Sequence, residues 1–453
     1  MYVLVSKVRI WVSLFLFGAI AGCATPSHIN NDPISESKSV DQALVLTGQV
    51  GQKSDEILVF LAFSGGGTRA AAFSYGVLQK LRDTTYTSDG KEIRLLDEVD
   101  VISSVSGGSF TSAYFGLFGD RVFEDYEDVF LRRNVQKTLL GSVFNPLNWL
   151  RALFTGLNRT ERAVDFYNRT IFENGTFADI HNRDGPRIEI NATDLSIGER
   201  FAFNQEQFNM LCSDLGSFSV ARAVAASSAV PVVFKPVVLE NHDGCSYSDS
   251  PHLAAARRYA EENPRFTSLL ESFDSYQDKE SRRFVHLIDG GITDNLGVRT
   301  LYNRLETAGI TVGTDIEIAG KPKYLVAIVV NANTDPQNPM DITKKPPSNL
   351  EVMSAVTSTQ IQRFSSESLS LLEDSMKYWA NEFSTPERPV TPFLISLNFQ
   401  DLPSENLKIL FNNMATSFSL PDNEVDSLIT AGNQLLEQSS EFQAFVDAID
   451  SEL

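Results

Sequence analysis

The stretch Val99-Asp100-Val101-Ile102-Ser103-Ser104-Val105-Ser106-Gly107-Gly108 decides the fold, because a short apolar strand ends here in a turn of small residues. The pattern that follows predicts a helix over residues 107–118. An earlier apolar run, Ile57 to Phe63, ends in the glycine cluster of residues 64–67. Apolar residues at every fourth position then predict a helix over residues 70–81. The chain thus repeats the order of strand, tight turn and helix.

Further short apolar runs along the chain are typical of buried strands. They cover residues 188–192, 284–288, 324–331 and 393–397. Helical patterns separate them, for example the alanine-rich segment 219–230, which Pro231 ends. Such alternation implies an α/β fold whose sheet is parallel or mostly parallel, with helices on both faces.

The 453 residues are expected to divide into four parts. Residues 1–22 have the pattern of a signal peptide. Residues 23–55 are expected to form a flexible tether, because they are rich in Ser, Asn, Asp and Pro and show no apolar period. Residues 56–402 should form the sheet domain. Residues 403–453 are acidic, have helical patterns and are expected to pack on that domain.

The N-terminal pattern points to a secreted, lipid-anchored protein. Lys7 and Arg9 precede the apolar run of residues 10–20, which is short for a membrane-spanning helix of about 20 residues. Ile20-Ala21-Gly22-Cys23 resembles a bacterial lipobox, which implies acylation of Cys23 and a place in the bacterial cell envelope. Ala24 after that cysteine favours the outer membrane. The alternative is a soluble secreted protein in which Cys23 is incidental.

The formal net charge of −20 at pH 7 argues against nucleic acid as a partner, because phosphate binding requires clustered Lys and Arg. The average surface would also be repelled by an anionic bilayer. A lipid anchor on Cys23, and not charge, would therefore hold the chain at a membrane.

Cys212 and Cys245 are the two cysteines outside the N-terminal pattern. In an oxidising compartment a disulfide between them could persist. Two buried free thiols are the alternative, and the sequence does not give the separation that would decide between them.

The turn after the second strand has the pattern of a nucleophile elbow around Ser106. Such a strained turn needs small residues two positions before and after the serine, and here they are Ser104 and Gly108. The helix that begins at Gly107 directs its first N–H groups toward the place where an oxyanion would form. Ser106 is therefore the candidate nucleophile.

The second turn, Gly65-Gly66-Gly67-Thr68-Arg69, presents consecutive backbone N–H donors. Such a loop suits either a phosphate or a tetrahedral oxyanion. A dinucleotide-binding fingerprint needs a glycine where this chain has Ala70. A Walker loop needs a lysine after the glycines, and none follows here. Both observations argue against a nucleotide-binding loop. A structural glycine turn is a further alternative.

A carboxylate motif, Asp289-Gly290-Gly291, follows the predicted strand 284–288. Because parallel strands point their carboxyl ends the same way, Asp289 should stand at the same sheet edge as Ser106 and the glycine cluster. The last histidine is His286, which excludes the chain order Ser, Asp, His. At the strand period of two, His286 faces away from Asp289 and is predicted to be a packed strand residue. The remaining hypothesis is that Asp289 activates Ser106 directly, without a histidine between them.

Together these motifs resemble the patatin-like phospholipases over residues 57–331. The flanking segments Ala225-Ala226-Ser227-Ser228-Ala229-Val230-Pro231 and Asp294-Asn295-Leu296-Gly297 are similar to that family as well. The resemblance implies a three-layer α/β/α fold with a mostly parallel sheet. It also implies a Ser-Asp dyad without histidine. Ser104 and Ala70 depart from the family, which usually has glycine at both positions.

The resemblance assigns a role to each motif. It makes Ser106 the nucleophile and Asp289 the general base, and it makes the backbone from Gly65 to Arg69 the oxyanion hole, with Arg69 helping to hold that loop. It implies no cofactor, and the histidines lack the spacing of a zinc site.

The expected function is a membrane-anchored serine acyl hydrolase that cleaves ester bonds of phospholipids or related lipids at a membrane surface. A lipid acyltransferase that uses the same dyad is one alternative. A non-catalytic envelope protein that binds partners through the same fold is the other, and the sequence identifies no such partner.

Overall fold

A computed structural model places most of the chain outside the N-terminal region. It describes residues 29–36, 38, 54, 56–88, 90–135, 159–231, 233–245, 251–260, 267–312, 322–334, 344, 346–414 and 416–452. The expected signal peptide and Cys23 lie outside these residues. Among the described residues, no helix combines the length and apolar character needed to cross a bilayer.

A central eight-stranded sheet organises the domain, in the order β10-β9-β1-β4-β5-β8-β7, with β6 also paired to β5. The strands are β1 (Ile57–Phe63), β4 (Val99–Val105), β5 (Arg187–Asp194), β6 (Glu199–Ala202), β7 (Val237–Glu240), β8 (Phe284–Asp289), β9 (Tyr324–Asn331) and β10 (Thr391–Asn398). A separate hairpin joins β2 (Thr85–Ser88) to β3 (Lys91–Arg94). The five strands from β10 to β5 pair in parallel.

The other three strands are antiparallel to their neighbours. Both β6 and β8 run antiparallel to β5, and β7 runs antiparallel to β8. The sheet is therefore mixed and mostly parallel, as expected. The expectation that β8 is one of the parallel strands is wrong.

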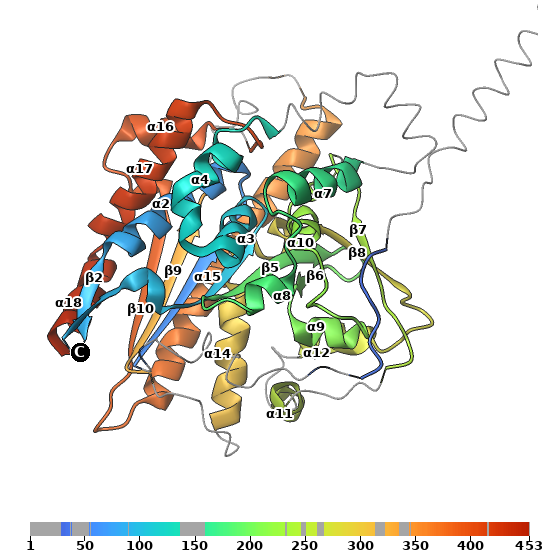
Figure 1. Ribbon diagram of the computed structural model, residues 1–453, viewed down its shortest axis with the longest axis horizontal. Helices are drawn as coiled ribbons and strands as arrows, with labels where there is room; N and C mark the ends of the chain where they lie inside the picture. The colour runs from blue at the N-terminus through green and yellow to red at the C-terminus, as the bar shows by residue number, and fades with distance from the viewer. Residues whose placement is uncertain are drawn as a thin grey trace, which may run out of the picture.

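Helices cover both faces of the sheet and give three layers (Figure 1). The helices of the first strand-turn-helix units and of the C-terminal region pack on one face, and α14 and α15 pack on the other. Their bounds are α2 (Thr68–Asp83), α3 (Gly107–Phe118), α4 (Val122–Tyr126), α7 (Arg159–Thr170), α8 (Phe177–His181), α9 (Gln205–Met210), α10 (Val220–Ser227), α11 (Pro251–Ala260), α12 (Thr267–Ser275), α13 (Gly291–Asp294), α14 (Arg299–Val312), α15 (Asn349–Phe383), α16 (Glu405–Asn412), α17 (Asp422–Gln438) and α18 (Ser440–Glu452).

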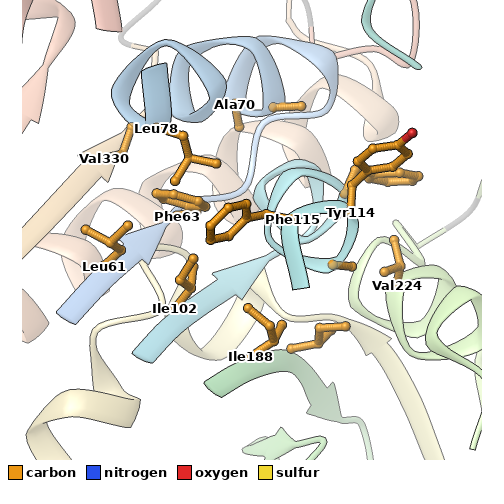
Figure 2. Close-up of a cluster of buried hydrophobic side chains, with 14 of the residues drawn as sticks. Leu61, Phe63, Ala70, Leu78, Ile102, Tyr114, Phe115, Ile188, Val224 and Val330 are labelled. Atoms are coloured by element: carbon orange, nitrogen blue, oxygen red, sulfur yellow. The ribbon is translucent and has the colours of Figure 1, made fainter. Parts of the chain in front are cut away.

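The alternation of side chains along β1 builds both cores. Leu61 and Phe63 belong to the core beneath α2 and α3, whereas Phe60 and Ala62 belong to the core beneath α14 and α15. Figure 2 shows Leu61, Phe63 and Ile102 on the face that α2 and α3 cover. Because both faces of the strand are buried, its sequence is a continuous apolar run.

The C-terminal helices pack on the domain, and α17 lies directly against α2. Their backbones come so close that a Cβ on Gly76 would overlap the carbonyl oxygen of Ile429. A Cβ on Gly432 would likewise overlap the carbonyl oxygen of Phe73. Two glycines, one on each helix, thus allow an approach that larger residues would prevent.

Part of the expected tether is fixed on the domain. The Ile34 N–H donates to the Cys212 carbonyl at 2.8 Å, and the Asn31 side chain donates to the Glu240 carbonyl at the same distance. In the structure, Cys212 and Cys245 form a disulfide beside this segment. The polar composition of residues 29–36 suggested a flexible chain, but backbone groups of this segment and the Asn31 side chain find hydrogen-bond partners on the domain.

Candidate active site

Ser106 occupies a strained turn between β4 and α3. Its φ is 50° and its ψ is −115°, a conformation that a residue with a side chain rarely adopts. The residue is buried, with 4% of its surface exposed. It directly precedes the first N–H groups of α3, whose partial positive charge favours a negative charge there. These properties are those of a nucleophile elbow.

Ser227, the last residue of α10, holds this elbow. The Ser106 N–H donates to Ser227 Oγ at 2.8 Å, and the Ser227 hydroxyl donates to the Asn191 carbonyl at 2.6 Å. Because Ser227 has a single hydroxyl proton, Ser109 must be the donor in the 3.0 Å contact between the two serine hydroxyls. Ser227 therefore ties the elbow to β5. The motif Ala225–Pro231 marks this segment in the sequence, but sequence reasoning assigned Ser227 no role.

The carboxylate of Asp289 contacts the Ser106 side chain. The Ser106 hydroxyl donates to Asp289 Oδ2 at 2.9 Å, and the Gly291 N–H donates to Asp289 Oδ1 at 2.8 Å. Burial raises the pKa of Asp289 from 3.8 to about 6, although the bonds from Gly291 and Ser106 act in the opposite direction. At neutral pH the carboxyl is thus ionised and still basic enough to accept the serine proton.

Asp289 reaches Ser106 from the direction opposite to the expected one. In the antiparallel pair, Leu287 lies opposite Asp194 at the end of β5, and Asp289 lies opposite Ala192. The strand β8 therefore starts beyond the carboxyl edge of β5 and runs back toward it. Its last residue arrives at the edge where β4 ends, so the predicted contact forms although the predicted strand direction is wrong.

The glycine loop, residues 64–69, lies against the elbow. A Cβ on Gly107 would overlap the Gly67 carbonyl oxygen, so glycine is required where the two turns meet. Gly66 and Gly67 have φ values of 142° and 61°, which favour glycine. Within the described part of the chain, the N–H groups of Gly66, Gly67 and Gly107 donate to no protein acceptor. They can therefore bind a negatively charged oxygen next to Ser106.

A family comparison connects these features. A sequence model described as "Patatin-like phospholipase" matches residues 61–302, more than half of the chain. The chain belongs to the patatin-like phospholipase family. The matched segment runs from β1 into α14 and includes both turns and Asp289. The strands β9 and β10, α15 and the C-terminal helices of this patatin-like chain lie outside it.

Solved structures similar to the patatin-like chain include human GIVD cytosolic phospholipase A2, at 13% identity and a TM-score of 0.47, covering 90% of this chain and 64% of that chain. The same human protein in complex with methyl gamma-linolenyl fluorophosphonate and terbium chloride matches at 12% identity and a TM-score of 0.42, covering 90% and 61%. The patatin-like chain thus spans less than two thirds of the length of these proteins. A comparison with curated proteins gives no match.

The structure narrows the predicted oxyanion hole of this patatin-like chain. The Gly65 N–H donates to the Asn295 carbonyl and the Thr68 N–H donates to the Ser417 carbonyl, each at 2.9 Å. These two amides are therefore occupied, whereas Gly66 and Gly67 are the glycines of the loop whose amides have no acceptor among the described residues.

Arg69 holds the loop instead of binding a ligand. Its Nε donates to the Ala332 carbonyl at 2.9 Å and its Nη1 donates to the Met414 carbonyl at 2.6 Å. The side chain is buried, and burial lowers the pKa of Arg69 to about 10, so it stays charged at neutral pH. The predicted role in holding the loop agrees with these bonds, which reach two segments outside the matched family region.

The two departures from the family pattern fit the turns. Ser104 is buried, and its hydroxyl accepts a hydrogen bond from Ser112 Oγ at 2.6 Å. Ala70 is fully buried in the first turn of α2. Both side chains are small enough for the elbow and the glycine loop to form around them.

The histidine of β8 lies away from the dyad. His286 is exposed, whereas its neighbours Val285 and Leu287 are buried, so it alternates as a strand residue should. The prediction that His286 is packed is wrong, because this side of β8 is exposed at both Phe284 and His286. Among the described residues, no group of His, Cys, Asp and Glu side chains is placed to hold a metal ion.

Proposed function

We propose that this chain hydrolyses ester bonds of phospholipids or related lipids through an acyl-enzyme intermediate on Ser106. The observation that carries this proposal is the 2.9 Å hydrogen bond from the Ser106 hydroxyl to a buried carboxylate whose pKa is about 6. Membership of the patatin-like phospholipase family supports a lipid ester as the substrate.

In the proposed acylation step, Ser106 Oγ attacks the ester carbonyl carbon while Asp289 Oδ2 accepts the hydroxyl proton. The carbonyl oxygen becomes an oxyanion, which the N–H groups of Gly66, Gly67 and Gly107 stabilise. The bond to the leaving alcohol then breaks, and Asp289 returns the proton to the alcohol oxygen. In deacylation, water attacks the acyl ester and gives its proton to Asp289. Release of the fatty acid returns that proton to Ser106.

The proposal predicts that Ser106→Ala abolishes release of free fatty acid from phosphatidylcholine vesicles and from a short-chain ester. A loss of at least about 10⁴-fold is expected, because the acyl-enzyme can no longer form. Ser74→Ala is the matched control, since Ser74 is also a buried serine, lies within α2, and its hydroxyl has no hydrogen-bond partner among the described residues. Full activity of folded Ser106→Ala would overturn the proposal.

A lipid anchor on Cys23 is a second part of the proposal. The segment 29–36 is held on the domain by bonds such as that from Ile34 to Cys212, and residues 24–28 can span at most about 20 Å between the anchor and Ile29. An anchor would therefore keep the acyl hydrolase close to the membrane surface of a bacterial envelope.

The anchor predicts that the full chain, expressed in a bacterium, incorporates labelled palmitate and fractionates with the outer membrane. Cys23→Ala should remove the label and release the protein from the membrane fraction. Palmitate label that persists in Cys23→Ala would contradict the anchor without affecting the proposed chemistry.

A further inference from the structure

The glycine loop is held by a part of the chain that the family match does not include. The residues concerned are Met414, Thr416, Ser417 and Phe418, which lie between α16 and α17 and are called here the C-terminal brace. We propose that this brace is a positioning element of the oxyanion hole. The proposal rests on the proposed function, because it assigns the brace to the step in which the oxyanion forms.

Two neighbouring residues of the glycine loop bind the brace. The Thr68 N–H donates to the Ser417 carbonyl at 2.9 Å, and Arg69 Nη1 donates to the Met414 carbonyl at 2.6 Å. Gly67 lies so close that a Cβ there would overlap the Ser417 carbonyl oxygen. The brace thus binds Thr68, which directly follows Gly66 and Gly67, and it also contacts Gly67 itself.

The brace is itself fixed by a turn and by an aromatic side chain. Ser417 Oγ accepts the Ser419 N–H at 3.0 Å and donates to the Ser419 carbonyl at 2.5 Å. The Phe418 ring packs on Phe110 of α3, with 5.8 Å between ring centroids, and on Phe234 at 6.4 Å. The direction of the Ser417 carbonyl therefore depends on a local side-chain turn, and the brace is packed against the helix that follows Ser106.

A glycine loop needs such external contacts to act as an oxyanion hole. Gly66 and Gly67 have access to far more backbone conformations than other residues, and only some of these aim both N–H groups at one oxygen. An oxyanion hole stabilises the transition state because its N–H donors are already oriented before the negative charge develops on the substrate oxygen. By occupying the Thr68 N–H, the brace holds the end of the loop and leaves Gly66 and Gly67 for the substrate oxygen.

The test compares Ser417→Ala with Ser417→Thr. The alanine removes the hydroxyl that holds the turn, and the threonine keeps it. Ser427→Ala is the matched control, because Ser427 also donates to a backbone carbonyl, that of Asn423, but lies on α17 away from the loop. Ser417→Ala should lower kcat about tenfold at unchanged KM, which is less than the loss caused by removing an oxyanion donor outright. Ser417→Thr should restore kcat to within about twofold.

Two further measurements separate positioning from simple loss of folded protein. A trifluoromethyl ketone forms a tetrahedral adduct with the serine. Its inhibition constant should rise about tenfold in Ser417→Ala, the same factor by which kcat falls. The fraction of active sites titrated by a fluorophosphonate should stay unchanged. A reduced active fraction with normal kcat per site would overturn the proposal.

Hydrogen exchange distinguishes a failure of the brace from a failure of the proposed function. Peptides that cover residues 64–70 should exchange faster in Ser417→Ala than in Ser427→Ala, whether or not the chain hydrolyses an ester. Unchanged exchange would overturn the brace and leave the dyad in place. Faster exchange in Ser417→Ala, combined with a wild-type protein that neither hydrolyses esters nor reacts with fluorophosphonate, would support the brace and reject the proposed function.

Discussion

The elbow at Ser106 and the glycine loop beside it are both turns from a strand into a helix, but different parts of the chain hold them. The elbow is tied through Ser227 to Asn191 within the matched family region. The loop is tied through Arg69 and Thr68 to Met414 and Ser417, outside that region. The candidate nucleophile is thus held within the matched family region, whereas the proposed oxyanion hole is held by the C-terminal part of this chain.

The two turns also contain buried charges of opposite sign. Asp289, at the elbow, accepts hydrogen bonds from Ser106 and from Gly291. Arg69, in the loop, donates to two backbone carbonyls and to a threonine hydroxyl. The carboxylate can exchange a proton near neutral pH, since its pKa is about 6, whereas the guanidinium stays charged and acts as a fixed link. In the proposed mechanism the carboxylate therefore takes part in the reaction, and the guanidinium only positions the loop.

The largest expected effect comes from removing the base at the elbow. Asp289→Asn should lower kcat/KM by about 10³-fold, because the amide cannot accept the Ser106 proton. Asp100→Asn is a suitable control, since Asp100 is a buried aspartate at the other end of β4 that accepts the Val59 N–H. Steady-state kinetics on a soluble ester measures both. Activity of Asp289→Asn within a few-fold of wild type would show that another group accepts the proton.

The same substitution should stabilise the protein in a pH-dependent way. The folded state raises the pKa of Asp289 from 3.8 to about 6, so the folded state binds the proton more tightly than the unfolded state. Below about pH 4 the carboxyl is protonated in both states and this stabilisation is fully present, and wild-type stability then falls as the pH rises from about 4 through 6. A pKa shift of this size corresponds to a loss of about 3 kcal/mol in the unfolding free energy.

Urea unfolding at two pH values measures this effect. Asp289→Asn should exceed wild type in unfolding free energy at pH 8 and should lose most of that advantage at pH 4. An advantage of equal size at both pH values would contradict the claim that burial of the charged Asp289 carboxylate destabilises the wild-type protein.

A smaller effect is expected from the residue that ties the elbow to β5. Ser227→Ala leaves the Ser106 N–H without its acceptor and the Asn191 carbonyl without its donor, so kcat should fall about tenfold and stability by about 1–3 kcal/mol. Ser228→Ala is the matched control at the residue that directly follows the same helix, because its hydroxyl donates to the Val224 carbonyl one turn earlier. If both variants behave alike, the elbow does not depend on Ser227, and its contrast with the glycine loop disappears.

The sequence predicted most of the sheet because buried strands leave a direct signal. The run Ile57–Phe63 is apolar throughout since both of its faces pack against helices, and Ser106 lies in the turn that small residues indicated. The direction of β8 could not be predicted in this way. Apolar character reports burial and is the same for a parallel and an antiparallel neighbour.

The sequence indicated that Arg69 helps to hold the glycine loop, but it gave no signal for the C-terminal partners of that loop. The Ser417 carbonyl is a backbone group, and any residue at that position would supply it, so only the packing of α17 against α2 reveals its partner. The fixed segment 29–36 was missed for a related reason. Its polar residues have the composition of a tether, and their partners on the domain are distant in sequence.

The central claim is that Ser106 is a nucleophile activated by Asp289, and labelling with a fluorophosphonate as a function of pH tests it most directly. The adduct should map to Ser106 by mass spectrometry. Its rate constant should be level above about pH 7 and fall about tenfold per pH unit below 6, as Asp289 becomes protonated. In Asp289→Asn the labelling should be slow at every pH. An adduct on another residue, or a rate constant without an inflection between about pH 5 and 7, would contradict the account.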